Sequence, residues 1–339
     1  MTAGVSKYDM ELSSIIRENH MNKKTDNSTC LALDLGGTKL LIGEVDSNGG
    51  LLRSKKYKTG YLTQTEGTRV IFEALDDYIA TVGWVNEKPE YMGMGMIGQV
   101  DYINSNWIMI DPSRKENIPI GSLISEKYHF NIRIENDVKA ATLAEKAFGA
   151  GKEDKDFIYL NVGTGIAAGF VADGRLLRGW ENDSGEIGHI VVDIDSDVEC
   201  ECGRRGCLEA IASGRGMYKR VIQLREKYPD SQLFKSGDDD ITAKTIFAAA
   251  GAGDALASRI ADEAFGAVTC GIMNLIRVSN PERIILGGGV ISDGWMLEQI
   301  LKRIGKKELG SVKKGIVLSG LNSNTVGIIG AAAVGFGFY

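Results

Sequence analysis

The sequence is poor in cysteine, histidine and proline: its 339 residues include five, three and five of them. An odd number of cysteines in a long chain is unlike the disulfide framework of a secreted protein, so we expect a cytoplasmic protein. No apolar run reaches the ~18 residues that a membrane span requires. The C-terminal run VGIIGAAAVGFGFY is too short and too rich in glycine, and we expect no association with a membrane.

The sequence also lacks an excess of basic over acidic residues, with 39 Lys and Arg against 45 Asp and Glu. The formal net charge is −6 at pH 7, which argues against a protein that binds nucleic acid through bulk charge. Hydrophobic content of 43% and charged content of 25% are ordinary for a soluble globular protein. The length allows two domains with sizeable cores.

Glycine, in contrast, is abundant, with 43 residues. Four clusters (LGGTK, GMGMIG, NVGTGIAAG and LGGGV) lie beside apolar runs, as expected for tight turns where backbone approaches a ligand. Any single cluster is explained as well by an ordinary turn, but four together favour a ligand. GMGMIG also matches the dinucleotide fingerprint GxGxxG. We reject a Rossmann site there because the residues that follow do not open a helix.

Two segments of the chain resemble each other. Residues 33–54 (LDLGGTKLLIGEVDSNGGLLRS) and 160–179 (LNVGTGIAAGFVADGRLLRG) both predict strand, Gly/Thr turn, strand, turn and strand. Helical periodicity alternates with these strands, which indicates an α/β protein of two related halves. The segments predicted to be helical are 8–19, 67–83, 138–151, 216–228, 254–280 and 325–337.

Three further motifs carry groups suited to phosphate chemistry. In LALDLGGTK, a buried strand leads to Asp34 and then to a turn that could cradle phosphate while Asp34 holds Mg²⁺; a plain hairpin with a solvated Asp is the alternative. In IRIENDVKAA, Glu135, Asn136 and Asp137 lie between a strand and a helix, as a helix cap or as a general base. The glycines of ILGGGV suit an adenine or a ribose, or form a generic turn.

The segment SGEIGHIVVDIDSDVECECGRRGCLEA is the most specific signal. Its His189, Cys200, Cys202 and Cys207 are four ligands, the number that a closed tetrahedral zinc site needs. A Cys-x-Cys disulfide would be strained, so we favour structural Zn²⁺ over redox chemistry. No ligand position remains for water, and we do not expect this metal to catalyse a reaction.

These motifs closely resemble the ROK family (repressors, open reading frames and sugar kinases), in particular its bacterial glucokinase-like members. The markers run from about Leu31 to Val334: LDLGGTK, IENDVKAA, NVGTGIAAG, SGEIGH, CECGRRGCLEAIASG and NPERIILGGGV. The resemblance implies an actin-like ATPase (ribonuclease H-like) fold, duplicated, with a cleft between two domains, and a homodimer. We expect an N-terminal extension or tag at 1–27, one α/β domain from 28–136 plus 324–339, and a second, with the zinc loop, at 137–323.

The resemblance also implies roles for single residues. Asp137 would deprotonate the sugar hydroxyl, and Asn136 beside it would contact the sugar. Glu186, His189 and Glu209 would hold other sugar hydroxyls, with His189 using the ring nitrogen that zinc leaves free. The residues implied for binding ATP are Asp34 (with Mg²⁺), Gly36, Gly37, Thr38, Lys39, Gly163, Thr164, Gly165, Gly287 and Gly288.

The expected activity is ATP-dependent phosphorylation of a hexose, with glucose to glucose 6-phosphate as the first expectation and N-acetylmannosamine or another hexose as the alternative. A sugar-responsive transcriptional regulator is a further alternative, but about 27 residues before the first core strand are too few for a winged helix-turn-helix. The chain departs from the family pattern at Ile97-Gly98, Val138-Lys139, Ala167 and Ser184, so the identity of the sugar stays open.

Overall fold

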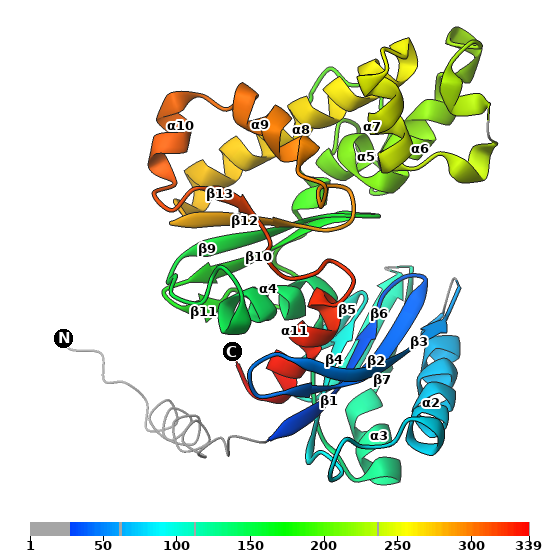
Figure 1. Ribbon diagram of the computed structural model, residues 1–339, viewed down its shortest axis with the longest axis vertical. Helices are drawn as coiled ribbons and strands as arrows, with labels where there is room; N and C mark the ends of the chain where they lie inside the picture. The colour runs from blue at the N-terminus through cyan, green and yellow to red at the C-terminus, as the bar shows by residue number, and fades with distance from the viewer. Residues whose placement is uncertain (1–27, 61–62, 112, 236, 339) are drawn as a thin grey trace.

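Two five-stranded sheets with the same strand order form the frame of the molecule (Figure 1). This computed structural model describes residues 28–60, 63–111, 113–235 and 237–338; the helix expected at 8–19 lies outside them. We call the first sheet with the helices packed on it the first lobe, and the second sheet with its helices the second lobe. The domain limits expected from the sequence stay a prediction.

The first sheet has the order β3-β2-β1-β4-β8. Its first three strands form the antiparallel meander that the sequence predicts, and β1 is apolar from Cys30 to Leu35 except for Asp34 near its end. β4 and β8 continue the sheet in parallel with β1, which brings the carboxyl ends of three strands to one edge. The strands are β1 (Thr29–Leu35), β2 (Lys39–Asp46), β3 (Leu51–Lys58), β4 (Tyr91–Met96) and β8 (Asn131–Asn136).

The second sheet repeats this arrangement in the order β11-β10-β9-β12-β13. Again three antiparallel strands are followed by two strands parallel to the first of them. The strands are β9 (Phe157–Val162), β10 (Ile166–Ala172), β11 (Arg175–Leu176), β12 (Arg283–Gly287) and β13 (Ile316–Leu318). The internal repeat predicted from residues 33–54 and 160–179 is therefore confirmed.

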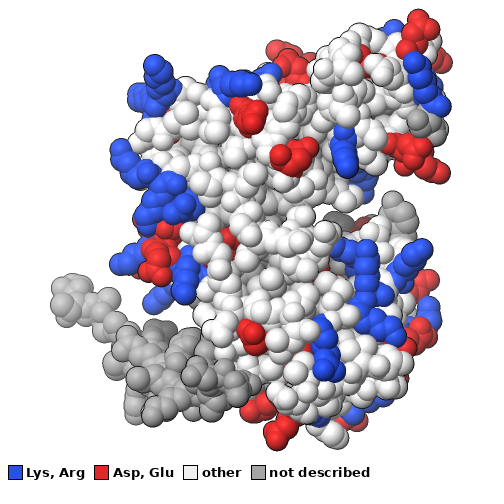
Figure 2. Space-filling model, viewed as in Figure 1, with Lys and Arg blue, Asp and Glu red and all other residues white. Residues whose placement is uncertain are grey.

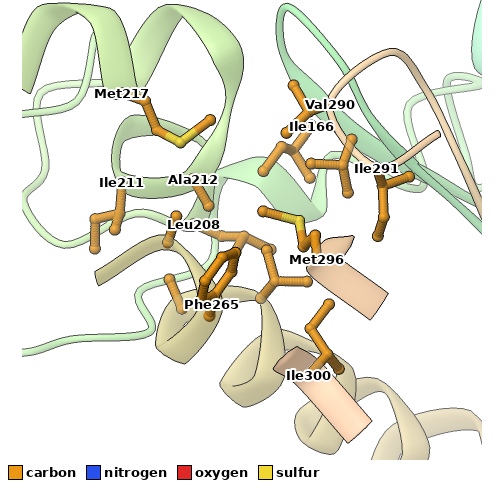
Figure 3. Close-up of a cluster of buried hydrophobic side chains, with 14 of the residues drawn as sticks. Ile166, Leu208, Ile211, Ala212, Met217, Phe265, Val290, Ile291, Met296 and Ile300 are labelled. Carbon is orange, nitrogen blue, oxygen red and sulfur yellow. The ribbon is translucent and has the colours of Figure 1, made fainter. Parts of the chain in front are cut away.

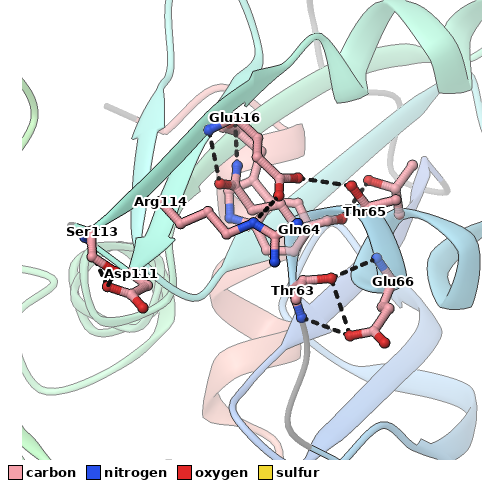
Figure 4. A network of polar contacts seen from close by, with 10 residues as sticks. Thr63, Gln64, Thr65, Glu66, Asp111, Ser113, Arg114 and Glu116 are labelled. Atoms are coloured by element: carbon pink, nitrogen blue, oxygen red, sulfur yellow. Dashed lines mark hydrogen bonds and ion pairs between the residues drawn. The ribbon is translucent and has the colours of Figure 1, made fainter.

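The first lobe carries a small three-stranded sheet whose strands are β5 (Gln99–Asp101), β6 (Asn106–Asp111) and β7 (Arg114–Ile118). Since β5 follows β4 directly, no helix follows GMGMIG, and the rejection of a Rossmann site is confirmed. The sheet is tied to the start of α2 (Gln64–Thr81), where Gln64 Nε2 donates to Trp107 O at 2.8 Å (Figure 4). A capping box between Thr63 and Glu66 starts α2 three residues before the predicted helix.

Two helices rich in small residues, α4 (Asp137–Phe148) and α11 (Val326–Gly335), lie between the sheets (Figure 1). α11, from the end of the chain, packs against α4 and against β4 and β1 of the first sheet. A Cβ at Gly330 would overlap the carbonyl group of Ala140 on α4. The small residues of α11 therefore allow it to pack closely against α4.

The rest of the second lobe is helical. Its largest apolar core joins the second sheet to several helices; Figure 3 shows Leu208, Met217, Phe265 and Met296 packed within it. The predicted helix at 216–228 ends at Gln223, and the one at 254–280 matches α8. The helices are α5 (Leu208–Ala212), α6 (Gly214–Gln223), α7 (Ala243–Gly251), α8 (Ala255–Ser279), α9 (Trp295–Arg303) and α10 (Lys306–Ser311), while α3 (Ile120–Tyr128) belongs to the first lobe.

The surface carries charges of both signs. On the face in Figure 2, Lys and Arg side chains are interspersed with Asp and Glu, and the surface is notched where the lobes meet on the right. In the part of the chain that the structure describes, no helix combines the length and the apolar character needed to cross a membrane.

Candidate active site

Two carboxylates meet at the edge of the first sheet where its parallel strands end. Asp34 lies on β1 opposite Gly95 of β4, and Gly95 in turn lies opposite Glu135 of β8. Asp137 follows as the first residue of α4. Because Gly95 has no side chain, both Asp34 Oδ1 and Asp137 Cα lie 3.8 Å from the point where its Cβ would be. The strand order therefore brings together two acids that are about a hundred residues apart in sequence.

The carboxylate of Asp137 has one oxygen engaged and one open. Oδ1 accepts the Val138 N–H at 2.9 Å, and the described residues provide no donor to Oδ2. Burial, followed by the charges of Asp34 and Glu186, raises the pKa of Asp137 to about 7, although the Val138 N–H and Lys139 oppose the shift. A carboxyl with a pKa near neutral and an open oxygen is suited to general-base chemistry.

Asn136 caps the helix that begins with Asp137. Its Oδ1 accepts the N–H groups of Val138 at 3.1 Å and Lys139 at 3.2 Å, and its Nδ2 donates to Gly98 O at 3.1 Å. The two interpretations of this motif are therefore compatible, because Asn136 holds the helix start that presents Asp137. A contact between Asn136 and a sugar stays a prediction.

The first glycine turn joins β1 to β2 beside Asp34. The Gly36 N–H donates to Lys39 O at 3.0 Å, and Gly37 and Thr38 are exposed at the tip of the turn. Asp34 is only 8% exposed, and burial raises its pKa to about 6 against the opposing charge of Lys39. Its carboxylate lies against the first turn of α11, so closely that a Cβ at Gly327 would overlap it.

The second glycine turn occupies the equivalent place between β9 and β10. The Gly163 N–H donates to Gly165 O at 2.9 Å, and Thr164 is exposed at the tip. The Gly287-Gly288 segment at the end of β12 lies beside it: a Cβ at Gly288 would overlap the carbonyl group of Val162. Gly288 has φ +95°, a conformation that favours glycine. The structure thus brings the second predicted phosphate turn and the predicted adenosine segment together.

The four predicted zinc ligands form one cluster. One ligand atom each from His189, Cys200, Cys202 and Cys207 lies within 4.8 Å of the other three. Cys200 Sγ is 3.5 Å from His189 Nδ1, and Cys202 Sγ is 3.6 Å from Cys207 Sγ. Bond lengths of ~2.3 Å for Zn–S and ~2.0 Å for Zn–N in a tetrahedral site require separations of roughly 3.5–3.8 Å between ligands. These two separations match, and imidazole and thiolate are the donors that Zn²⁺ prefers, so the residues suit a zinc site.

The cluster depends on a loop stabilised by backbone turns. Gly203 and Gly206 have φ of +84° and +70°, a left-handed conformation that favours glycine and allows tight turns between the ligands. The Cys200 N–H donates to Arg204 O at 2.8 Å. The N–H and guanidinium groups of Arg204 lower the pKa of Cys202 to about 6 and so favour the thiolate that binds metal.

Glu186, His189 and Glu209 approach one another from both ends of this loop. His189 turns Nδ1 toward the sulfur atoms, which leaves Nε2 for another partner. Glu209 is presented by α5, whose Leu208, Ile211 and Ala212 are buried. Burial by the surrounding protein, with Asp183 and Glu209, raises the pKa of Glu186 although its side chain reaches solvent, while Lys139 and His189 oppose the shift.

Glu209 also links the loop to the second glycine turn. Its Oε2 accepts the Ile166 N–H at 2.7 Å, and its Oε1 lies 3.5 Å from Arg215 Nη2. The backbone N–H of Arg215 donates to Thr164 O at 3.3 Å. Both residues line a recess of about 530 Å³ between the cysteine loop and α6. Arg215 was not predicted from the sequence, and its only signal there is its position directly after the motif CECGRRGCLEAIASG, which ends at Gly214.

The fold and the two paired glycine turns define a class of protein: the actin-like ATPase fold, with two duplicated α/β domains around a cleft. Within it, a model of the ROK family matches residues 30–335, and the chain belongs to that family.

Relatives of this chain include enzymes and regulators. Glucokinase from Thermotoga maritima is 32% identical over 313 residues, or 90% of this chain and 96% of that protein. The crystal structure of a ROK family glucokinase from Streptomyces griseus with glucose and AMPPNP has a TM-score of 0.75 and 28% identity, and the match covers 91% of this chain and 99% of that one. The xylose repressor from Caldicellulosiruptor bescii is 29% identical over 238 residues, or 70% of this chain and 59% of the repressor.

Proposed function

We propose that the protein is an ATP-dependent sugar kinase that phosphorylates a hexose, with glucose as the first substrate to test. The observation that carries the proposal is the open carboxylate oxygen of Asp137, which lies beside Asp34 at the edge of the first sheet. Two equivalent glycine hairpins, one in each lobe, accompany this pair. The similarity to glucokinases over nearly the whole chain supports the same activity.

In the proposed reaction, Asp137 is the general base. Its Oδ2 accepts the proton of a sugar hydroxyl, O6 in a hexose, as the oxygen forms a bond to the γ-phosphorus of ATP and the bond to ADP breaks. The hydrogen bond from Val138 N–H engages Oδ1 and leaves Oδ2 to accept the proton. Phosphoryl transfer depends mainly on positioning and on charge stabilisation, so closure of the lobes should contribute.

The nucleotide would be held by the glycine turns. In the first turn, which the Gly36 N–H closes, Gly37 and Thr38 would present backbone N–H groups and a hydroxyl to phosphate, and Lys39 would add an ammonium. In the second turn, which the Gly163 N–H closes, Thr164 and Gly165 would present N–H groups and a hydroxyl from the other lobe. Mg²⁺, when bound, would neutralise phosphate charge, and Asp34 fits its preference for carboxylate oxygens. Gly287 and Gly288, next to the second turn, would receive the adenosine.

Asn136, Glu186, His189 and Glu209 would orient the sugar. Zn²⁺ in the cysteine cluster would fix the backbone between Glu186 and Glu209 and the ring of His189 at the same time. It would supply structure rather than catalysis, because four protein ligands fill a tetrahedral site.

A coupled assay of ADP release with a panel of sugars tests the proposal. The panel contains glucose, fructose, allose, N-acetylglucosamine, N-acetylmannosamine and a β-glucoside. We expect sugar-dependent ADP release that the Asp137→Asn variant loses. A wild-type protein that holds zinc, binds ATP and phosphorylates no hexose would refute the proposed function.

Three further expectations belong to the same proposal. A cytoplasmic location agrees with the five cysteines, none of which forms a disulfide in the structure. A homodimer is expected from the family resemblance, and light scattering of the purified protein tests it. Since relatives include a repressor, a DNA shift assay beside the kinase assay separates the enzyme from a regulator.

A further inference from the structure

Lys139 is a buried cation that the proposed reaction does not use. It lies on α4, two residues after Asp137, and is 3% exposed. Its Nζ donates to Asn182 O at 3.0 Å, the one acceptor that the described residues offer it. Burying an ammonium is costly unless its charge and its hydrogen bonds are compensated. The position of Lys139 therefore requires a structural or functional explanation.

The acceptor belongs to a segment that spans the two lobes. Asn182 follows β11 of the second lobe, is 6% exposed and has φ +56°, a conformation uncommon outside glycine. Its Nδ2 donates to Val100 O of β5 at 3.2 Å and to Glu135 Oε1 of β8 at 2.8 Å. The neighbouring Glu181 accepts at its backbone oxygen from Gln99 Nε2 at 2.8 Å. The segment is thus attached to the first lobe at several points.

Glu135 closes this network on the side of the proposed base. It is 1% exposed, its Oε1 also accepts the Asn136 N–H at 2.9 Å, and its Oε2 pairs with Arg178 Nε at 2.8 Å. The Arg178 guanidinium lies over the ring of Tyr102, 4.2 Å from its centroid. Lys139, Asn182 and Glu135 therefore connect the start of α4 to the segment that leads to Glu186.

The negative charges of nearby acids also favour the position of the Lys139 ammonium. Burial lowers the pKa of Lys139, whereas Glu135, Glu186, Asp183 and Asp137 oppose that shift by attracting its ammonium. Lys139 in turn opposes the rise that burial causes in the pKa of Glu186. The charges of four acids thus act on this buried ammonium, and two of those acids, Asp137 and Glu186, are proposed to act on the sugar.

We propose that Lys139 is a positioning residue for the sugar: it holds residues 182–186 against α4, so that Glu186 is fixed at a set distance from Asp137. The inference rests on the proposed function and deepens it, because it explains how one sugar contact from the second lobe is kept in register with the base. Glu186 holds the sugar before and during phosphoryl transfer alike. Loss of its position weakens sugar binding and changes the chemical step little.

The test compares Lys139→Met with Lys146→Met. Methionine keeps the length of the side chain and removes its charge and its donors. Lys146 lies on the same helix, and its Nζ also donates to a backbone oxygen, that of Asp154, but away from the proposed sugar contacts. Sugar binding is measured by calorimetry with glucose and N-acetylmannosamine as probes, turnover by ADP release, and mobility of residues 178–186 by hydrogen–deuterium exchange.

For Lys139→Met we expect the Kd and KM of the sugar to rise ~10- to 100-fold, with kcat and the KM of ATP within about threefold of wild type. Exchange in residues 178–186 should become faster. Lys146→Met should leave all five quantities unchanged. Lys139→Gln, which keeps a donor without the charge, should fall between wild type and Lys139→Met, and it replaces that variant if methionine prevents folding.

The outcomes separate this inference from the proposed function. Unchanged sugar affinity and unchanged exchange in both Lys139 variants would overturn the inference, as would equal losses of sugar and ATP affinity. A wild-type protein that binds a sugar without phosphorylating it would refute the kinase and leave the role of Lys139 measurable by binding. If the wild-type protein binds neither probe and the Lys139 variants show the same exchange as the wild type, both the proposed function and the role of Lys139 are overturned.

Discussion

Replacing Asp137 by asparagine should abolish most activity and make the protein more stable. Asparagine keeps the size of the side chain and the acceptor for Val138 N–H but cannot take a proton. Loss of a general base costs ~10²- to 10⁴-fold in turnover. Stability should rise because the structure holds the Asp137 carboxylate where burial and the charge of Asp34 oppose its ionisation.

The size of the stability gain follows from the pKa. Raising the pKa of this carboxyl from 3.8 to about 7 corresponds to about 4 kcal/mol of opposition to the charged form. Solvent reaches the side chain, and the carboxyl shares its unfavourable interaction with Asp34. We therefore expect about 1–3 kcal/mol for Asp137→Asn.

The gain depends on pH in a defined direction. The folded protein binds this proton more tightly than the unfolded chain does. Wild type therefore carries no penalty below about pH 4, loses stability as the pH rises, and carries the full penalty above about pH 7. The variant should be about as stable as wild type in acid and more stable at about pH 8.

Urea unfolding of both proteins at several pH values measures this difference, with ADP release measured on the same samples. Asp239→Asn is the control, because Asp239 is exposed and makes no side-chain hydrogen bond among the described residues. Turnover of Asp137→Asn within tenfold of wild type would refute the general base. A variant no more stable than wild type at about pH 8 would refute the electrostatic argument.

Three other predictions address the base, the metal and the nucleotide. The kcat/KM of the wild type should fall as the pH drops below about 7, because the proposed base must be ionised; a flat profile from about pH 5 to 8 would contradict this. Metal analysis should find one zinc per chain. Cys202→Ser should lose this zinc together with thermal stability, whereas Cys270→Ser should keep it, because Cys270 lies on α8 and outside the cluster. Gly327→Ala should displace the Asp34 carboxylate and raise the KM of Mg-ATP more than that of the sugar, whereas Gly266→Ala, with open space at its Cβ, should leave both unchanged.

The parts of the fold that the sequence predicts are those set by local patterns. The β1–β3 meander and its copy in the second lobe follow from apolar strands separated by Gly, Asn and Asp turns, and the copy made the duplication visible. α8 was also predicted, because its 25 residues keep one apolar face. The short α5 was not predicted, since five residues are too few for a periodic signal and packing on α8 stabilises it.

In the candidate site, too, the features set by local sequence could be predicted and those set by tertiary contacts could not. The cysteine cluster could be predicted because its four ligands lie within one loop. The approach of Asp34 to Asp137 depends on the parallel pairing of β1, β4 and β8, which a family resemblance implies and local patterns do not.

The Lys139 network could not be predicted from local sequence. Asn182 contacts residues 43 and 47 positions earlier in the chain, and its left-handed backbone has no strong sequence signal. Lys139 is the third residue of a helix that begins directly after its cap, and a lysine at such a position would ordinarily be assigned to the surface. Only the tertiary structure shows that it is buried.

The position of α11 has a consequence for how the protein is made. The last helix of the chain buries Ile328, Ala331 and Ala332 in a cluster with Cys30 and Ala32, at the beginning of the first sheet. During synthesis, β1 leaves the ribosome long before α11 exists, and so the first lobe cannot complete its core until residues 326–335 have been synthesised. The main core of the second lobe lies within residues 158–316, and so this lobe can form its core before α11 is synthesised. In a nascent chain the second lobe should therefore fold before the first, and deletion of α11 (Val326–Gly335) should unfold the lobe that was synthesised first.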